Sequence, residues 1–156
     1  MNILVTGANG QLGRELYDRQ GLARASSKFY FTDKEDLDIT QKGDIEKFID
    51  NHAINAVINC AAYTDVDGAE NHQQAAWQLN EAAVGNLARL ATDKNLRLIH
   101  ISTDYVFDGT SHRPYREDDE PNPHSIYGKS KLAGEQHITR NNAGMIIRTA
   151  WLYSTY

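Results

Sequence analysis

Short, continuously apolar runs alternate along this chain with longer amphipathic segments, and this alternation restricts the fold more than any other feature of the sequence. A short run without a polar face suits a strand that is covered on both sides, and an amphipathic segment suits a helix packed against such a sheet. Regular alternation of the two favours parallel strands joined by right-handed helical crossovers. The sequence therefore predicts an α/β fold with a doubly wound parallel sheet of the Rossmann type.

The same patterns place the individual elements. Strands are predicted at residues 1–6, 29–32, 56–60, 96–102 and 145–149, with the short "LDI" at 37–39 as a possible sixth. Helices are predicted at residues 11–20, 42–51, 73–93 and 125–139. The segment 108–124 contains all 3 prolines and reads as a loop at the carboxyl end of a strand, where open α/β sheets place ligands.

Composition narrows the classes of function. The 156 residues, 40% of them hydrophobic, fit one globular domain. The net charge of −5, with scattered lysines and arginines, argues against a nucleic-acid partner. No stretch resembles a signal peptide or a bilayer span, so we expect a cytoplasmic protein without a membrane partner. Cys60 lies in an apolar run, which indicates packing, and a single cysteine excludes a disulfide framework.

A glycine-rich turn, "VTGANGQLG", follows the first predicted strand. Gly7, Gly10 and Gly13 stand three residues apart across the expected start of a helix. Gly7 permits a tight turn, Gly10 lets a pyrophosphate approach the backbone, and Gly13 allows the helix to pack closely on the sheet. The spacing departs from G-x-G-x-x-G, yet the strand–glycine–helix context favours a dinucleotide site over a turn that is merely rich in glycine.

An acidic residue follows the second predicted strand. Asp33 lies twenty residues beyond Gly13, where a carboxylate can accept hydrogen bonds from the ribose hydroxyls of adenosine. Lys34 comes next and can attract a 2′-phosphate. The pair therefore leaves the choice between NAD and NADP open.

The strand predicted at 96–102 ends in a polar cluster, "STDY", and a candidate catalytic pair follows it. Tyr127 and Lys131 are four residues apart and share one face of a predicted helix. A phenol is a poor acid at neutral pH, and a lysine ammonium one turn away stabilises the phenolate. An exposed tyrosine beside a solvated lysine is the ordinary interpretation of such spacing, but this helix follows the polar cluster directly.

The six histidines lack metal-ligand spacing, so surface or loop positions are expected for them.

Taken together, these motifs resemble the extended short-chain dehydrogenase/reductases and, within them, the dTDP-4-dehydrorhamnose reductase family, over the whole chain. The features of the superfamily correspond to Gly7, Gly10, Gly13, Asn80 and the triad Thr103, Tyr127 and Lys131. The narrower resemblance rests on "LDIT", "NCAAYTDVDGAE", "STDYVFDG", "YGKSKLAGE" and "RTAWLY".

The resemblance implies that a reduced NADP or NAD cofactor reduces the 4-keto group of dTDP-4-dehydro-L-rhamnose. Thr103 would hydrogen-bond the keto oxygen, Tyr127 would donate the proton, and Lys131 would tune Tyr127 and hold the nicotinamide ribose. Asp104 would contact sugar hydroxyls. Trp151 would line the same pocket, although a core aromatic role is the alternative.

The resemblance also implies further contacts to the cofactor. These are Asp38 and Ile39 for the adenine, Gly10, Gln11 and Leu12 for the phosphates, and Ala62, Tyr63 and Thr64 after the strand at 56–60. Some relatives place a divalent ion at a dimer contact with a glutamate at the position of Glu15, but one exposed glutamate is ordinarily just solvated, so no metal site is assigned. A homodimer is a possible assembly.

Two other functions remain open. One is an epimerase or dehydratase that uses the same glycines, Tyr127 and Lys131 on another nucleotide sugar. The other is a non-catalytic regulatory subunit, like the similar beta subunit of methionine adenosyltransferase. The resemblance further implies a second lobe that closes over the sugar. Residues 1–156 are therefore expected to be the cofactor-binding domain and to be insufficient for turnover. Without the second lobe, the last strand of the sheet is expected to leave an apolar edge that favours self-association.

Overall fold

A computed structural model describes residues 1–23, 26–154 and 156. Within this part of the chain, five parallel strands form one sheet in the order β2-β1-β3-β4-β5. The strands are β1 (Asn2–Thr6), β2 (Lys28–Thr32), β3 (Ala56–Asn59), β4 (Arg97–Thr103) and β5 (Gly144–Thr149). The strand order reverses between β1 and β3, and their carboxyl ends flank the crevice where open sheets bind ligands. The predicted parallel α/β sheet is confirmed.

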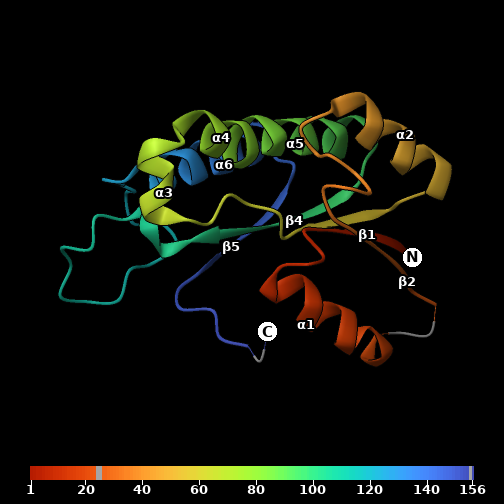
Figure 1. Cartoon of the computed structure of the whole chain (residues 1–156), viewed down its shortest axis with the longest axis horizontal. Helices are drawn as coiled ribbons and strands as arrows, with labels where there is room; N and C mark the ends of the chain where they lie inside the picture. Colours follow the sequence, from red (N-terminus) through yellow and green to blue (C-terminus); the bar gives the residue numbers. More distant parts are fainter. Residues whose placement is uncertain (24–25, 155) are drawn as a thin grey trace.

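The helices cover the two faces of the sheet unequally (Figure 1). Helix α1 (Gln11–Arg19) lies on one face, and α2 (Lys42–His52), α4 (Gln73–Trp77), α5 (Ala83–Asp93) and α6 (Ile126–Asn141) lie on the other. The main core, which includes Leu4, Val57 and Leu87, fills the space under this second group. In the part of the chain that the structure describes, no helix has both the length and the apolarity to cross a bilayer.

Two local expectations need correction. Residues 37–39 are not a strand, because the Leu37 N–H donates to the Asp33 carbonyl at 2.8 Å and the backbone turns there. The apolar pattern has another cause, since Leu37 and Ile39 are both buried in the main core. The sequence patterns also miss helix α3 (Val66–Asn71), whose N-cap Asp65 accepts a hydrogen bond from the Gly68 N–H at 2.9 Å.

The helix predicted at 73–93 is continuous but contains a wider turn. Between α4 and α5, residues Gln78–Ala82 form the π-helical turn η2. Asn80 lies in this turn, and its side chain accepts from the Tyr63 N–H at 2.8 Å and donates to the Tyr63 carbonyl at 3.1 Å and to Ser130 Oγ at 3.0 Å. Such turns are frequent at functional sites. Here the turn ties the segment after β3 to helix α6.

Helix α6 passes this turn so closely that Gly134 has no room for a side chain. A Cβ at position 134 would lie 2.2 Å from the Asn80 carbonyl oxygen. We therefore expect Gly134→Ala to lower the free energy of unfolding by about 1–3 kcal/mol, the usual cost of overpacking, as measured by urea unfolding. Gly43→Ala is the matched control, because nothing lies within 4 Å of a Cβ there, and it should lose no stability. Equal stability of the two variants would contradict the close approach.

Candidate active site

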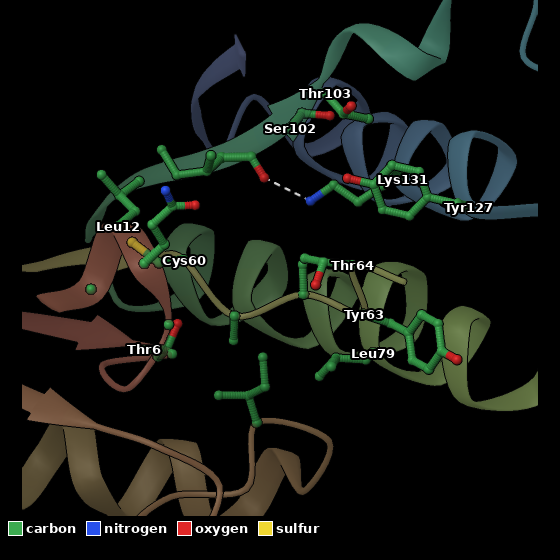
Figure 2. Close-up of a pocket in the computed structure, with 18 of the residues that line it drawn as sticks. Thr6, Leu12, Cys60, Tyr63, Thr64, Leu79, Ser102, Thr103, Tyr127 and Lys131 are labelled. Carbon is green, nitrogen blue, oxygen red and sulfur yellow. Dashed lines mark hydrogen bonds between the residues drawn. The ribbon is translucent and has the colours of Figure 1, made fainter. Parts of the chain in front are cut away.

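A pocket of about 810 Å³ opens at the carboxyl ends of β1, β3 and β4. This volume is within the range of sites for small molecules and cofactors. Every residue that the sequence assigns to the site lines this one pocket: Gly7, Gly10, Gln11, Leu12, Gly13, Asp33, Asp38, Ile39, Ala62, Tyr63, Thr64, Thr103, Asp104, Tyr127, Lys131 and Trp151. Figure 2 shows Leu12 and Cys60 towards one end of the pocket and Tyr127 and Tyr63 towards the other.

The glycine turn has the geometry of an anion site. Gly7 has a φ of +69°, in the left-handed region, and a Cβ there would lie 2.6 Å from the Ala61 nitrogen. A Cβ at Gly13 would lie 2.3 Å from the Gly7 carbonyl oxygen, so the helix packs on the turn only because this residue is glycine. The N-cap of α1 is Gly10, which offers no side-chain hydrogen bond. The first N–H groups of α1 therefore stay available for a negatively charged group.

Asp33 holds the glycine turn as well as lining the pocket. Its Oδ2 accepts from the Asn9 N–H at 2.8 Å and its Oδ1 accepts from the Lys34 N–H at 2.8 Å. Each carboxylate oxygen keeps a second lone pair for a ribose hydroxyl. Lys34 lines the pocket too, so a carboxylate and a cation stand side by side where a 2′-hydroxyl or a 2′-phosphate would lie. Sequence reasoning missed the Asn9 contact.

Asp38 is held in its ionised form. Its Oδ1 accepts from Thr40 Oγ1 at 2.7 Å and from the Thr40 N–H at 2.9 Å. The bond from the Thr40 side chain, followed by the bond from its backbone, lowers the pKa of Asp38. The carboxylate is thus a pure acceptor at neutral pH, which suits an amino group of a base.

Thr103 and Tyr127 lie on β4 and α6 at the same end of the pocket (Figure 2). Thr103 Oγ1 accepts from the Tyr105 N–H at 3.2 Å and donates to Asp104 Oδ1 at 3.2 Å. Tyr127 is buried, and this burial is the main cause that raises the pKa of its phenol, against a smaller lowering by Thr103. Tyr127 is therefore protonated at neutral pH, as a proton donor has to be.

Lys131 departs from the expectation that it stabilises the Tyr127 phenolate. Its Nζ donates to the Ile101 carbonyl at 2.7 Å, drawn as a dashed line in Figure 2, and lies 3.5 Å from His100 Nε2. Burial lowers the pKa of Lys131 to about 8. The pKa of Tyr127 is raised, not lowered, because Nζ is directed at the backbone of β4 and burial dominates at the phenol.

Trp151 lies just beyond β5, with a φ of +51°. Trp151 is 80% exposed and lines the pocket, so the alternative of a core aromatic is wrong. An exposed indole at the pocket wall can pack against a ligand that enters there.

Two caps fix the start of the helix that carries Tyr127 and Lys131. Ser125 Oγ accepts from the Gly128 N–H at 3.0 Å, which agrees with the predicted start of this helix. Glu70 Oε1, from α3, accepts from the Ile126 N–H at 2.8 Å. The first turn of α6 is therefore held by both its own N-cap and a neighbouring helix.

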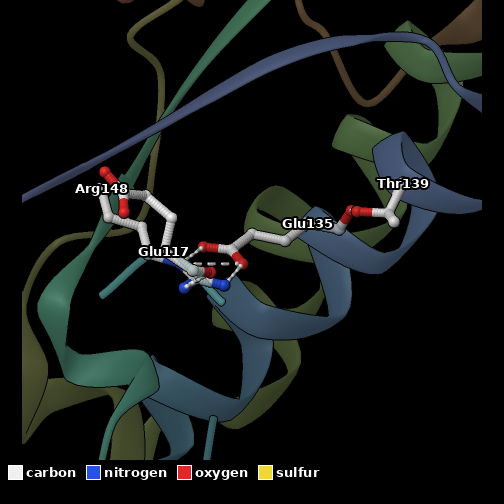
Figure 3. Close-up of polar contacts among 4 residues, drawn as sticks. All are labelled: Glu117, Glu135, Thr139 and Arg148. Atoms are coloured by element: carbon white, nitrogen blue, oxygen red, sulfur yellow. Dashed lines mark hydrogen bonds and ion pairs between the residues drawn. The ribbon is translucent and has the colours of Figure 1, made fainter. Parts of the chain in front are cut away.

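A partly buried ion pair fixes the same helix further along (Figure 3). Arg148 of β5 donates to the Glu135 carboxylate at 2.7 and 3.0 Å, and Glu135 in turn raises the pKa of Arg148. The guanidinium also donates to the Glu117 carbonyl at 3.3 Å and stands 5.0 Å from the centre of the Phe107 ring. Arg148 thus joins β5, α6 and the loop that separates Thr103 from Tyr127.

The pocket wall also includes Ser102 and Tyr105, which belong to the polar cluster at the end of β4, and Cys60, which sequence reasoning did not place there. Burial raises the pKa of Cys60 to about 12, so it is a thiol at neutral pH, in agreement with a packing role. His100 contradicts the expected surface or loop position, since it is fully buried in β4. The sequence could have indicated this burial, because His100 and Ser102 are two residues apart in a predicted strand and their side chains therefore share one face.

No metal site is assigned. Glu15 pairs with Arg19 at 3.1 Å on α1. Over residues 1–23, 26–154 and 156, no three histidine, cysteine, aspartate or glutamate side chains come together as a metal-binding group.

This strand order, the glycine turn and the tyrosine–lysine helix define a Rossmann-type protein of the short-chain dehydrogenase/reductase class. The chain belongs to the RmlD substrate binding domain family, which it matches over residues 1–156.

Three relatives illustrate the similarity. The chain is 42% identical over 157 residues to a dTDP-4-dehydrorhamnose reductase of Mycobacterium tuberculosis, covering 97% of this chain and 50% of that protein. It is 41% identical over 162 residues to methionine adenosyltransferase 2 subunit beta of Bos taurus, and the match covers 97% of this chain and 47% of that protein. The crystal structure of a dTDP-4-dehydrorhamnose reductase from Bacillus anthracis in complex with NADP matches this chain with a TM-score of 0.93 and 39% identity. The match covers 99% of this chain and 55% of that one. The chain spans about half the length of the curated relatives it matches.

Proposed function

We propose that this chain is the cofactor-binding part of an NAD(P)H-dependent reductase that converts dTDP-4-dehydro-L-rhamnose to dTDP-L-rhamnose. One observation carries the proposal: a protonated, buried Tyr127 lines the same pocket as the glycine turn. The names of the Mycobacterium tuberculosis and Bacillus anthracis relatives support the substrate.

The unpaired Cys60 suits a reducing compartment and so supports a cytoplasmic location.

The pocket fits a dinucleotide along its length. The start of α1 would hold the pyrophosphate, Asp33 and Lys34 the adenosine ribose, and Asp38 with Ile39 the adenine. Ala62, Tyr63, Thr64 and Lys131 would line the nicotinamide half. When bound, a reduced nicotinamide cofactor supplies the hydride. Lys34 beside Asp33, and the NADP bound to the Bacillus anthracis relative, support NADPH, while Asp33 also accommodates NADH.

The side chains supply the proton and the orientation. The keto carbon gains a hydride and its oxygen gains a proton, which the Tyr127 phenol would donate. The Thr103 hydroxyl would hydrogen-bond the same oxygen and stabilise the charge that develops on it. Asp104 would accept hydrogen bonds from sugar hydroxyls, and Trp151 would pack against the sugar or base.

Cofactor binding by this chain is the direct test. We expect calorimetry on residues 1–156 to show one site for NADPH, with NADH as the comparison, because both ends of the dinucleotide site are present. The absence of binding to a folded sample would refute the proposed cofactor site.

Turnover by the same chain should be negligible. Among the described residues that line the pocket, the cations are Lys34 and Lys131, both assigned to the cofactor, which leaves none for the substrate diphosphate. The measurement is NADPH oxidation with dTDP-4-dehydro-L-rhamnose. Rapid turnover would show that these 156 residues are sufficient and that no second lobe is needed.

We also propose that copies of this chain self-associate. Strand β5 lies at the end of the sheet, and Met145 and Ile147 on it are 60% and 40% exposed. An apolar sheet edge favours pairing with another chain. A sedimentation coefficient that does not change with concentration would contradict this.

The similarity to methionine adenosyltransferase 2 subunit beta supports a second candidate, a non-catalytic cofactor-binding subunit. Substrate turnover separates the two candidates. A form extended to the length of the relatives that binds NADPH but oxidises it with no dTDP-sugar would favour the subunit.

A further inference from the structure

Four buried polar side chains form a continuous chain beneath the pocket, from β1 through β3 and β4 to α6. Thr6 Oγ1 donates to Asn59 Oδ1 at 2.6 Å, and Asn59 Nδ2 lies 2.9 Å from His100 Nδ1. His100 Nε2 then lies 3.5 Å from Lys131 Nζ. Burying a polar group is unfavourable unless it is hydrogen-bonded, so this order of donors and acceptors determines which protonation states fit.

The contacts determine where the imidazole proton resides. The Thr6 hydroxyl donates to the carbonyl oxygen of the Asn59 amide, which leaves the amide nitrogen facing His100. An amide nitrogen only donates, so Nδ1 accepts and the ring proton is on Nε2. Burial, with the nearby Lys131 charge, lowers the pKa of His100 well below its usual value. The ring is therefore neutral, and its Nε2–H is directed at Lys131.

This N–H distinguishes the two forms of Lys131. An ammonium has donors only, so two donors would oppose each other across 3.5 Å. An uncharged amine has a lone pair and can accept the Nε2–H. Lys131 Nζ also donates to the Ile101 carbonyl at 2.7 Å, which both forms can do.

The remaining ionisable groups around Lys131 act weakly or in the other direction. Glu135, on the same helix, raises the pKa of Lys131, but its charge is shared with Arg148. Cys60, after β3, acts in the same direction as Glu135 but is a neutral thiol at neutral pH. Tyr127, one turn earlier on α6, is uncharged at neutral pH. Burial and the His100 N–H are thus the two influences that favour the amine.

We propose that His100 is a positioning residue, fixed by Asn59 as the Nε2–H tautomer, which holds Lys131 against the Ile101 carbonyl and favours release of a proton from the lysine. In the proposed reductase, this would set the charge of the lysine that lines the nicotinamide half of the pocket, and that consequence rests on the proposed function. The tautomer and the effect on Lys131 do not, because they need neither cofactor nor substrate.

The first measurement is the tautomer of His100 in the folded 156-residue chain, by ¹⁵N NMR of labelled histidines. The His100 signals are those lost in His100→Gln. We expect a neutral ring with the proton on Nε2 that does not titrate near the ordinary pKa of about 6.5. A ring protonated on Nδ1, or one that becomes charged near that pH, would overturn the proposal.

The second measurement is the pKa of Lys131 in His100→Gln, followed through the Cε signal of ¹³C-labelled lysine. A glutamine carbonyl can accept from the ammonium, so we expect the pKa of Lys131 to rise by about 1 unit, a tenfold change in its protonation equilibrium. His137→Gln is the matched control, because His137 on α6 is partly exposed and lies 3.7 Å from Glu81 of η2, and this variant should leave the pKa of Lys131 unchanged. An unchanged or lower pKa in folded His100→Gln refutes the role.

Thr6→Val provides a variant of similar shape if His100→Gln does not fold. Without the Thr6 hydroxyl, the Asn59 amide can turn and present its oxygen to His100. We expect a measurable fraction of Nδ1–H tautomer and a smaller rise in the pKa of Lys131. No change in either quantity would contradict the proposal. Failure of NADPH binding would refute the proposed function while leaving these results intact.

Discussion

Replacing Tyr127 with phenylalanine should lower the turnover rate by about 10²–10⁴-fold and leave NADPH affinity unchanged. The change removes the proton donor and little volume, so the fold and the cofactor contacts should persist. The measurement is kcat in a form of the protein that turns over a dTDP-sugar, beside the Kd for NADPH. Tyr17→Phe, on the exposed side of α1, is the control and should keep full activity. Retained activity in Tyr127→Phe would mean that another group is the acid.

The pH dependence of activity should distinguish Tyr127 from Lys131. The pKa of Tyr127 is raised, so its phenol stays protonated from acidic through neutral pH and loses its proton only under alkaline conditions. A loss of activity with rising pH near 8 should instead reflect Lys131, whose pKa is lowered to about 8.

Replacing Lys131 with methionine should reduce both cofactor affinity and rate. A hydrogen bond from a charged group contributes about 1.5–3 kcal/mol, so NADPH binding should weaken by about 10–100-fold. The folded-state pKa is about 8, so the ammonium is present below that pH and is lost above it. Wild-type binding should therefore weaken as pH rises through about 8, and this dependence should be absent from the methionine variant.

Lys129→Met provides the matched control, because Lys129 is exposed on the same helix. It should bind NADPH like the wild type at every pH. If Lys131→Met bound the cofactor with unchanged affinity, Lys131 would not contact the ribose, and its burial would have to be explained by the His100 network alone.

Local patterns were sufficient for several elements whose cause is local, although they missed the short helix α3. The strands of the sheet, the start of α6 at Ser125 and the shared face of Tyr127 and Lys131 all follow from periodicity and capping within a few residues. The "LDI" segment shows where this reasoning ends, because a buried turn and a buried strand require the same apolar residues. The sequence pattern cannot say whether such a segment finds a neighbouring strand to pair with.

The sequence by itself determined the α/β class and the glycine turn, because each depends on residue type and short spacing. The family resemblance supplied most of the other residues expected to line a dinucleotide site. Only the tertiary structure decided the direction of Lys131, the exposure of Trp151 and the burial of His100. These depend on which atoms of β1, β3, β4 and α6 meet across the sheet. A lysine's charge and orientation are set by burial and by donors and acceptors far away in the sequence, so no local pattern contains them.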